Sequence, residues 1–95
     1  MDSMGERHRR IVEEARATID RVDLEIVSLL NERARAVARI GDVKRELGLP
    51  IYQPEREEQI FGRVVEANTG PLEDAAVRRL FERILDEARR LERLQ

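Results

Sequence analysis

Apolar and polar residues follow a helical rhythm over almost the whole chain. From Glu6 onward, apolar residues return every three or four positions, which is the spacing of one face of an α-helix. No stretch alternates apolar and polar residues in the way that a half-buried strand does. The pattern therefore predicts an all-α fold.

Proline and glycine divide this rhythm into separate helices. Gly48-Leu49-Pro50 ends the first helix, because glycine is favoured just past a helix C-terminus and proline cannot continue the helix. Pro54 suits the first turn of a second helix, which Asn68-Thr69-Gly70-Pro71 ends. The predicted helices are residues 6–47, 54–67 and 73–94, all in one domain over residues 1–95.

The first predicted helix is too long for a compact domain of this size. It would extend roughly 60 Å at about 1.5 Å per residue, whereas a chain of 95 residues has only a small core of its own. A protruding helix with an apolar stripe needs a cover from outside the chain. The sequence therefore predicts an intertwined helical homodimer.

Three cations interrupt the apolar stripe of the first predicted helix. A charge removed from water is costly unless an anion pairs with it or its head reaches solvent. Arg33 and Lys44 share one face about 16 Å apart, which leaves room between them for a small dianion. Arg16 lies too far along the same helix to join them, so we expect it beside Arg33 and Lys44 of an antiparallel partner chain. The stripe reads Arg16, Ile19, Val22 or Asp23, Ile26, Leu30, Arg33, Val37, Ile40, Lys44.

The later helices carry further candidates. Arg56 and Glu57 follow Pro54 one turn before an apolar face, where the simplest interpretation is a solvated arginine and a carboxylate that stabilises the first turn. Glu92 continues the apolar stripe of the third helix, where a glutamate near a helix end would ordinarily face solvent. That stripe reads Val77, Phe81, Ile84 or Leu85, Ala88, Glu92.

Composition and charge narrow the function classes. Apolar residues make up 41% of the chain and aromatic residues only 3%, which favours packed helices over sheets. The net charge is −2, and Glu13 and Glu14 offset the basic cluster Arg7-His8-Arg9-Arg10, so nucleic acid is not the expected partner. One histidine and no cysteine predict neither a metal site nor thiolate chemistry. Neither a signal peptide nor a membrane span is evident, so we expect a cytoplasmic protein.

Taken in order, these segments resemble the all-helical class of chorismate mutase over nearly the whole chain. The matching stretches are EEARATIDRVD, LLNERARAVARIGDVK, LGLPIYQPEREEQI and NTGPLEDAAVRRLFERILDEA. The resemblance implies a dimer of three-helix chains that rearranges chorismate to prephenate in phenylalanine and tyrosine biosynthesis. It implies no cofactor.

The resemblance also implies roles for individual residues. Arg33, together with Arg16 of the neighbouring chain, would hold the two carboxylates of chorismate. Lys44 would bind a carboxylate and the ether oxygen of the bond that breaks. Arg56 would support the anionic pocket, and Glu57 would accept a hydrogen bond from the ring hydroxyl. The implied catalytic residues are Arg33, Lys44, Glu92 and Arg16, and the substrate-binding residues are Arg16, Arg33, Lys44, Gln53, Arg56, Glu57, Ala88 and Glu92.

Three positions depart from a common bacterial version of the pattern. Gln53 stands where aspartate is frequent, Ala88 where a small hydroxyl residue is frequent, and Glu92 where glutamine is frequent. In the implied mechanism, Glu92 would donate to the ether oxygen opposite Lys44, and a glutamate donates only when protonated. We therefore hypothesise that burial or the substrate's negative charge keeps Glu92 neutral, so that the rate falls as pH rises.

Two other functions stay open. A lyase that removes pyruvate from isochorismate would use the same scaffold and a similar cationic pocket. A non-catalytic helical module that regulates an enzyme of the aromatic pathway is the alternative of another class. The full set of cations favours the mutase, because a scaffold gains nothing from buried charge. A partner enzyme from the aromatic pathway is compatible with activity.

Overall fold

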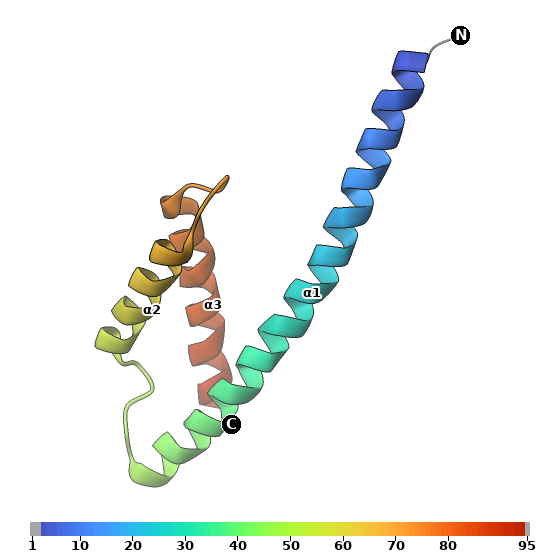
Figure 1. Cartoon of the computed structure of the whole chain (residues 1–95). Helices are drawn as coiled ribbons and strands as arrows, with labels where there is room; N and C mark the ends of the chain where they lie inside the picture. Colours follow the sequence, from blue (N-terminus) through green and yellow to red (C-terminus); the bar gives the residue numbers. More distant parts are fainter. Residues whose placement is uncertain (1–2, 95) are drawn as a thin grey trace. The chain divides into compact units, whose positions relative to one another are not determined.

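A computed structural model describes residues 3–94, and this range contains three α-helices joined by two short connectors. The helices are α1 (Ser3–Leu47), α2 (Pro54–Ala67) and α3 (Asp74–Leu94), labelled in Figure 1. No strand occurs within this described range, and the all-α prediction is confirmed.

Two helix starts differ from the predicted ones. The first helix begins at Ser3 rather than Glu6, because no residue between them breaks a helix and Gly5 costs only about 1 kcal/mol. The third helix begins at Asp74 rather than Glu73. The carbonyl of Glu73 accepts hydrogen bonds from the backbone N–H groups of Ala76 and Val77, so Glu73 is the residue that caps the helix rather than its first member.

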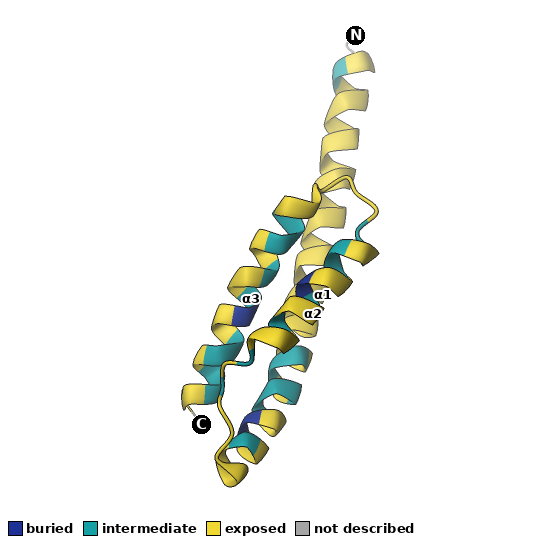
Figure 2. Ribbon diagram, turned by 90° about the vertical axis from the view of Figure 1, so that its left-hand side faces the viewer, coloured by how far each residue is buried: buried dark blue, intermediate teal, exposed yellow. Residues whose placement is uncertain are grey.

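The chain divides into two compact units, Met1–Arg33 and Ala34–Gln95. The first unit is described as helix from Ser3, and every residue from 6 to 32 is exposed, as the yellow N-terminal ribbon in Figure 2 shows. The second unit contains the C-terminal part of α1 together with α2 and α3.

The core of the second unit lies between α2 and α3, which run side by side in Figures 1 and 2. Phe61 of α2 and Leu85 of α3 are its buried apolar residues, with 7% and 4% of their surface exposed. The guanidinium of Arg78 lies 4.2 Å from the centre of the Phe61 ring and 3.3 Å from a Glu58 carboxylate oxygen. Arg78 thus closes one edge of the contact between the two helices.

The C-terminus of α1 has the glycine-capped geometry that the sequence predicts. Gly48 adopts a positive φ of 68°. Its N–H donates to the carbonyl of Arg45 at 3.3 Å, and the N–H of Leu49 donates to the carbonyl of Lys44 at 2.8 Å. These two bonds are those of a Schellman motif, which turns the chain sharply away from the helix axis.

The turn between α2 and α3 is organised by Asn68. Its side-chain amide donates to the carbonyl of Leu72 and to the carboxylate of Asp74, each at 2.8 Å. Its side-chain oxygen accepts a hydrogen bond from the N–H of Gly70 at 3.2 Å. One amide therefore ties the end of α2 to the start of α3.

Over residues 3–94, no helix is both long and apolar enough to cross a membrane.

Candidate active site

Lys44 and Glu92 form an ion pair between the ends of α1 and α3. The Nζ atom of Lys44 lies 3.1 Å from Oε2 and 3.5 Å from Oε1 of Glu92, and it donates to the backbone carbonyl of Ile51 at 3.2 Å. Only 13% of the Lys44 side chain and 9% of the Glu92 side chain are exposed. The interpretation that Glu92 faces solvent is therefore wrong.

The Lys44 ammonium is held by two neighbouring groups. An ammonium has three hydrogens to donate. Among the residues that the structure describes, its acceptors are both carboxylate oxygens of Glu92 and the carbonyl of Ile51, and the contact with Oε1 is the longest of the three at 3.5 Å. These contacts fix the direction of the side chain.

Gly41 explains how Glu92 comes so close to α1. Gly41 is buried, and a Cβ built on it would lie 3.4 Å from Cγ of Glu92. A larger side chain at this position would meet Glu92 directly. The glycine inside the long helix therefore allows Glu92 of α3 to approach α1 closely.

A hollow of about 410 Å³ opens beside this ion pair. Its size suits a small organic acid rather than a macromolecule. Its charged lining residues are three cations, Lys44, Arg45 and Arg93, and one carboxylate, Glu92. The lining residues are Gly41, Lys44, Arg45, Gly48, Leu49, Ile51, Glu92 and Arg93.

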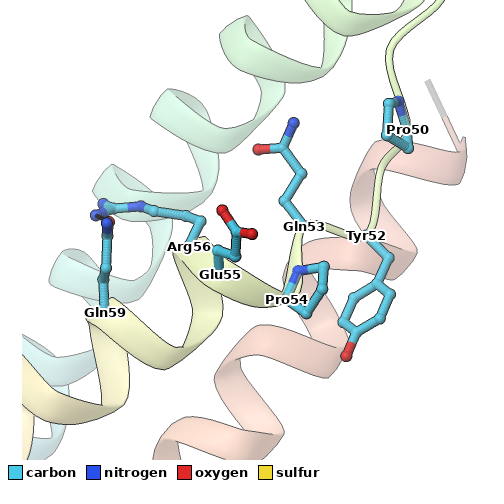
Figure 3. Close-up of a pocket in the computed structure, with 7 residues that line it drawn as sticks. All are labelled: Pro50, Tyr52, Gln53, Pro54, Glu55, Arg56 and Gln59. Carbon is cyan, nitrogen blue, oxygen red and sulfur yellow. Dashed lines mark hydrogen bonds between the residues drawn. The ribbon is translucent and has the colours of Figure 1, made fainter.

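A second hollow of about 480 Å³ lies at the N-terminus of α2 (Figure 3). Gln53 and Glu55 extend to one side of the chain there, while the ring of Tyr52 extends to the other. Gln53 is half-buried and makes no side-chain cap to the helix. Arg56 is exposed, and its Nη1 atom donates to Oε1 of Gln59 at 3.5 Å. The lining residues are Pro50, Tyr52, Gln53, Pro54, Glu55, Arg56 and Gln59.

Glu57 is held by a residue that the sequence analysis missed. Arg89 of α3 donates through Nη1 to Oε2 of Glu57 and through Nη2 to the carboxylate of Asp86. The hydrogen bond that Arg89 donates to Glu57 raises the pKa of Arg89 above its ordinary value, against the opposing effect of burial. Arg89 follows Leu85 by four residues and precedes Glu92 by three, so this helical spacing is the signal that could have identified it.

The other predicted site residues are distributed over both units. Ala88 is half-buried on α3 in the second unit. Arg16 and Arg33 belong to the first unit, where Arg16 is exposed and Arg33 is half-buried.

Across the described residues 3–94, no group of three or more His, Cys, Asp or Glu side chains is arranged to hold a metal ion.

The sequence model of one family, chorismate mutase type II, matches residues 15–93. That span includes both helical ends that meet at Lys44 and Glu92. The chain belongs to the chorismate mutase type II family. The match begins just before Arg16 and ends just after Glu92, so every residue proposed above for this chorismate mutase domain lies within it.

Named relatives and a solved structure agree with this membership. The chain is 42% identical over 78 residues to the bifunctional chorismate mutase/prephenate dehydratase of Neisseria gonorrhoeae, covering 82% of this chain and 21% of the relative. It is 49% identical over 57 residues to the protein of the same description from Aquifex aeolicus, covering 60% and 16%. The chain thus spans about a fifth of the length of these relatives.

A solved structure of chorismate mutase from Thermus thermophilus resembles the present fold over most of both chains. The TM-score is 0.86 at 42% sequence identity, and the match covers 88% of this chain and 96% of the other. The chain therefore has the all-helical fold of this family.

Proposed function

We propose that this chain catalyses the rearrangement of chorismate to prephenate. One C–O bond breaks and one C–C bond forms within a single molecule, so the substrate itself supplies both reacting ends. The observation that carries the proposal is the Lys44–Glu92 pair beside a hollow of suitable size, in a chain of the chorismate mutase type II family. The similarity to the Thermus thermophilus chorismate mutase supports the same reaction.

Lys44 would stabilise the charge that develops during the reaction. The ether oxygen becomes more negative as its C–O bond lengthens, so a fixed ammonium beside it lowers the energy of the transition state more than that of the substrate. Contacts with Glu92 and Ile51 already hold this ammonium, which limits the reorganisation that the reaction requires. Glu92 would border the same oxygen from the other side.

The arginines would hold the substrate in its reactive shape. Arg33, with Arg16 of a second chain, would bind the two carboxylates and keep the reacting ends near contact, because bidentate arginine contacts fix both position and orientation. Arg56 would strengthen the anionic pocket, and Glu57 would accept a hydrogen bond from the ring hydroxyl. Gln53 and Ala88 would border the substrate without the contacts that aspartate and a hydroxyl residue would give.

A homodimer is part of this proposal. Four apolar residues at helical spacing in the first unit are between 36% and 55% exposed, and they are Ile19, Val22, Ile26 and Leu30. Burial of apolar surface contributes roughly 25 cal/mol per Å², so a second copy that covers this stripe would stabilise both chains. An antiparallel arrangement would also bring Arg16 of one chain to the site of the other.

The proposed reaction also suggests a pathway partner. The relatives from Neisseria gonorrhoeae and Aquifex aeolicus are described as joining chorismate mutase to prephenate dehydratase. We therefore propose that an enzyme of the aromatic pathway works with this domain.

The cytoplasmic location stays a prediction.

The test uses the purified chain with two substrates. Loss of chorismate absorbance and the appearance of prephenate are followed in one reaction, and release of pyruvate from isochorismate in a parallel one. We expect chorismate to be consumed by a dimeric protein and isochorismate to be left unchanged. Faster release of pyruvate would assign the lyase reaction instead, and a folded dimer inert toward both would favour the regulatory module.

A further inference from the structure

We propose that Arg89 is a positioning residue that holds Glu57 for the substrate's ring hydroxyl and thereby sets the preference for a hydroxylated ring. This inference rests on the proposed function, because Glu57 has a substrate role only there. Arg89 and Glu57 are 32 positions apart in the sequence and come from different helices. Their contact is therefore a product of the way α3 packs on α2.

The guanidinium of Arg89 is fixed by two carboxylates through two different nitrogens. Nη1 donates to Glu57 on α2, and Nη2 donates to Asp86 one turn earlier on α3. A planar guanidinium held at two nitrogens has little freedom to rotate. Asp86 is 54% exposed whereas Glu57 is 18% exposed, so Asp86 is the solvent-side anchor and Glu57 is the sheltered partner.

Tyr52 provides a third contact. The guanidinium carbon of Arg89 lies 5.6 Å from the centre of the Tyr52 ring, a distance at which a cation is attracted to the ring face. Tyr52 immediately precedes Gln53 in the connector and lines the hollow at the start of α2. Arg89 thus links three segments of the second unit: the connector, the first turn of α2 and the C-terminal half of α3.

The geometry leaves Glu57 ready to accept a hydrogen bond. Arg89 contacts Oε2, and among the described residues no hydrogen bond or ion pair involves Oε1. A glutamate without a partner samples several rotamers, and ordering it when a ligand binds costs conformational free energy. The ion pair removes much of that cost, so an oxygen of Glu57 is already aimed when the substrate arrives.

A second ion pair between the same helices offers a matched control. Arg78 of α3 contacts Glu58 of α2 at 3.3 Å and lies over Phe61, so it repeats the ion pair and the ring contact of Arg89. Its side chain is 44% exposed, and that of Glu58 is 69% exposed. Neither residue belongs to the proposed substrate site. Loss of Arg78 therefore reports what an interhelical ion pair contributes to stability alone.

The experiment compares Arg89→Met, Arg89→Lys and Arg78→Met in the full chain. Each variant is assayed with chorismate and with the analogue in which hydrogen replaces the ring hydroxyl. We expect Arg89→Met to lower kcat/KM for chorismate roughly 10-fold, the scale of one hydrogen bond to a charged group, and to change the analogue by less than about 2-fold. Arg89→Lys should recover part of the loss, because lysine keeps the charge but lacks the planar fork.

Two further measurements separate positioning from simple support. In a Glu57→Gln background, Arg89→Met should cost less than about 2-fold, because residues that act through one another are not additive. Arg78→Met should keep the wild-type preference for the hydroxylated substrate even if its unfolding temperature falls as far as that of Arg89→Met. Additive losses, equal losses on both substrates, or a faster Arg89→Met enzyme would each overturn the proposal. A wild-type chain that leaves chorismate unchanged would instead overturn the proposed function.

Discussion

The ammonium of Lys44 lies 3.1 Å from the Glu92 carboxylate, although the two residues are 48 positions apart in the sequence. The contact joins the last turn of α1 to the end of α3. The carbonyl of Ile51, in the connector that follows α1, supplies the second partner of the ammonium. The geometry of the proposed reaction centre therefore depends on how three segments of the second unit meet.

Replacing the cations of the site should remove most of the activity. We expect Lys44→Ala and Arg33→Ala each to lower kcat by about 100-fold or more, because loss of one fixed donor to a transition state costs on the order of 3–4 kcal/mol. Steady-state kinetics measure the loss, and circular dichroism checks that the helices persist. Arg83→Ala, at a 74% exposed position paired with Glu87, should keep wild-type activity. Near-normal turnover in either site variant would contradict the assigned roles.

Replacing Glu92 by glutamine should test which property of this side chain the reaction uses. In the structure, Glu92 accepts a hydrogen bond from the Lys44 ammonium at 3.1 Å. Glutamine keeps the shape of glutamate and always offers a donor. If a donor to the ether oxygen is what the site requires, Glu92→Gln should keep or raise kcat with chorismate at saturation. A loss of kcat of about 10-fold or more in a folded Glu92→Gln protein would show that the site requires the carboxylate instead.

Position 41 should tolerate alanine but no larger side chain. An alanine Cβ would make an ordinary contact with Glu92 at 3.4 Å, and alanine favours a helix over glycine by up to about 1 kcal/mol. Gly41→Ala should therefore keep its activity and unfold at the same or higher temperature. Gly41→Leu should displace Glu92 and lower kcat at least about 10-fold, because even small misplacement of a catalytic group is costly. An active leucine variant would show that the closeness of α1 and α3 is not required.

The turn after α1 should be sensitive to a side chain at Gly48. A residue with a Cβ is strained at a φ of 68°, so Gly48→Ala should lower the free energy of unfolding by about 1–2 kcal/mol. Gly62 is the opposite case, since it lies in the exposed interior of α2 and a Cβ there would meet nothing within 4 Å. Gly62→Ala should therefore stabilise the chain by roughly 0.5–1 kcal/mol. Urea unfolding measures the free energy of unfolding of both variants, which should fall for Gly48→Ala and rise for Gly62→Ala.

Mixed dimers should test whether Arg16 crosses between chains. If each site combines Lys44 of one chain with Arg16 of the other, an Arg16→Ala chain and a Lys44→Ala chain are inactive alone. Refolded together in equal amounts, they should recover about a quarter of the wild-type activity, because half of the dimers would carry one intact site of two. Failure to recover activity in verified mixed dimers would show that Arg16 serves its own chain or none.

The helices and the composition of the site could be predicted from local sequence signals. Pro54 and Gly48 mark helix ends through their own backbone restrictions, which act over a few residues and need no tertiary contact. The cations stand out because charge on an apolar stripe is unusual wherever the stripe lies. Lys44 was therefore found as a candidate from the pattern, whereas the role of Glu92 came from the resemblance, because the pattern alone placed Glu92 in solvent and the structure buries it.

The partners of these side chains were decided only by the tertiary structure. Periodicity specifies which face of a helix a residue occupies, but it does not specify which residue of another helix lies opposite. The Lys44–Glu92 ion pair, the hold of Arg89 on Glu57 and the approach of Glu92 to Gly41 all depend on the packing of helices that are distant in sequence. Each of these contacts depends on distances of a few ångströms between helices that the connectors bring together. The periodicity of a single helix does not specify those distances.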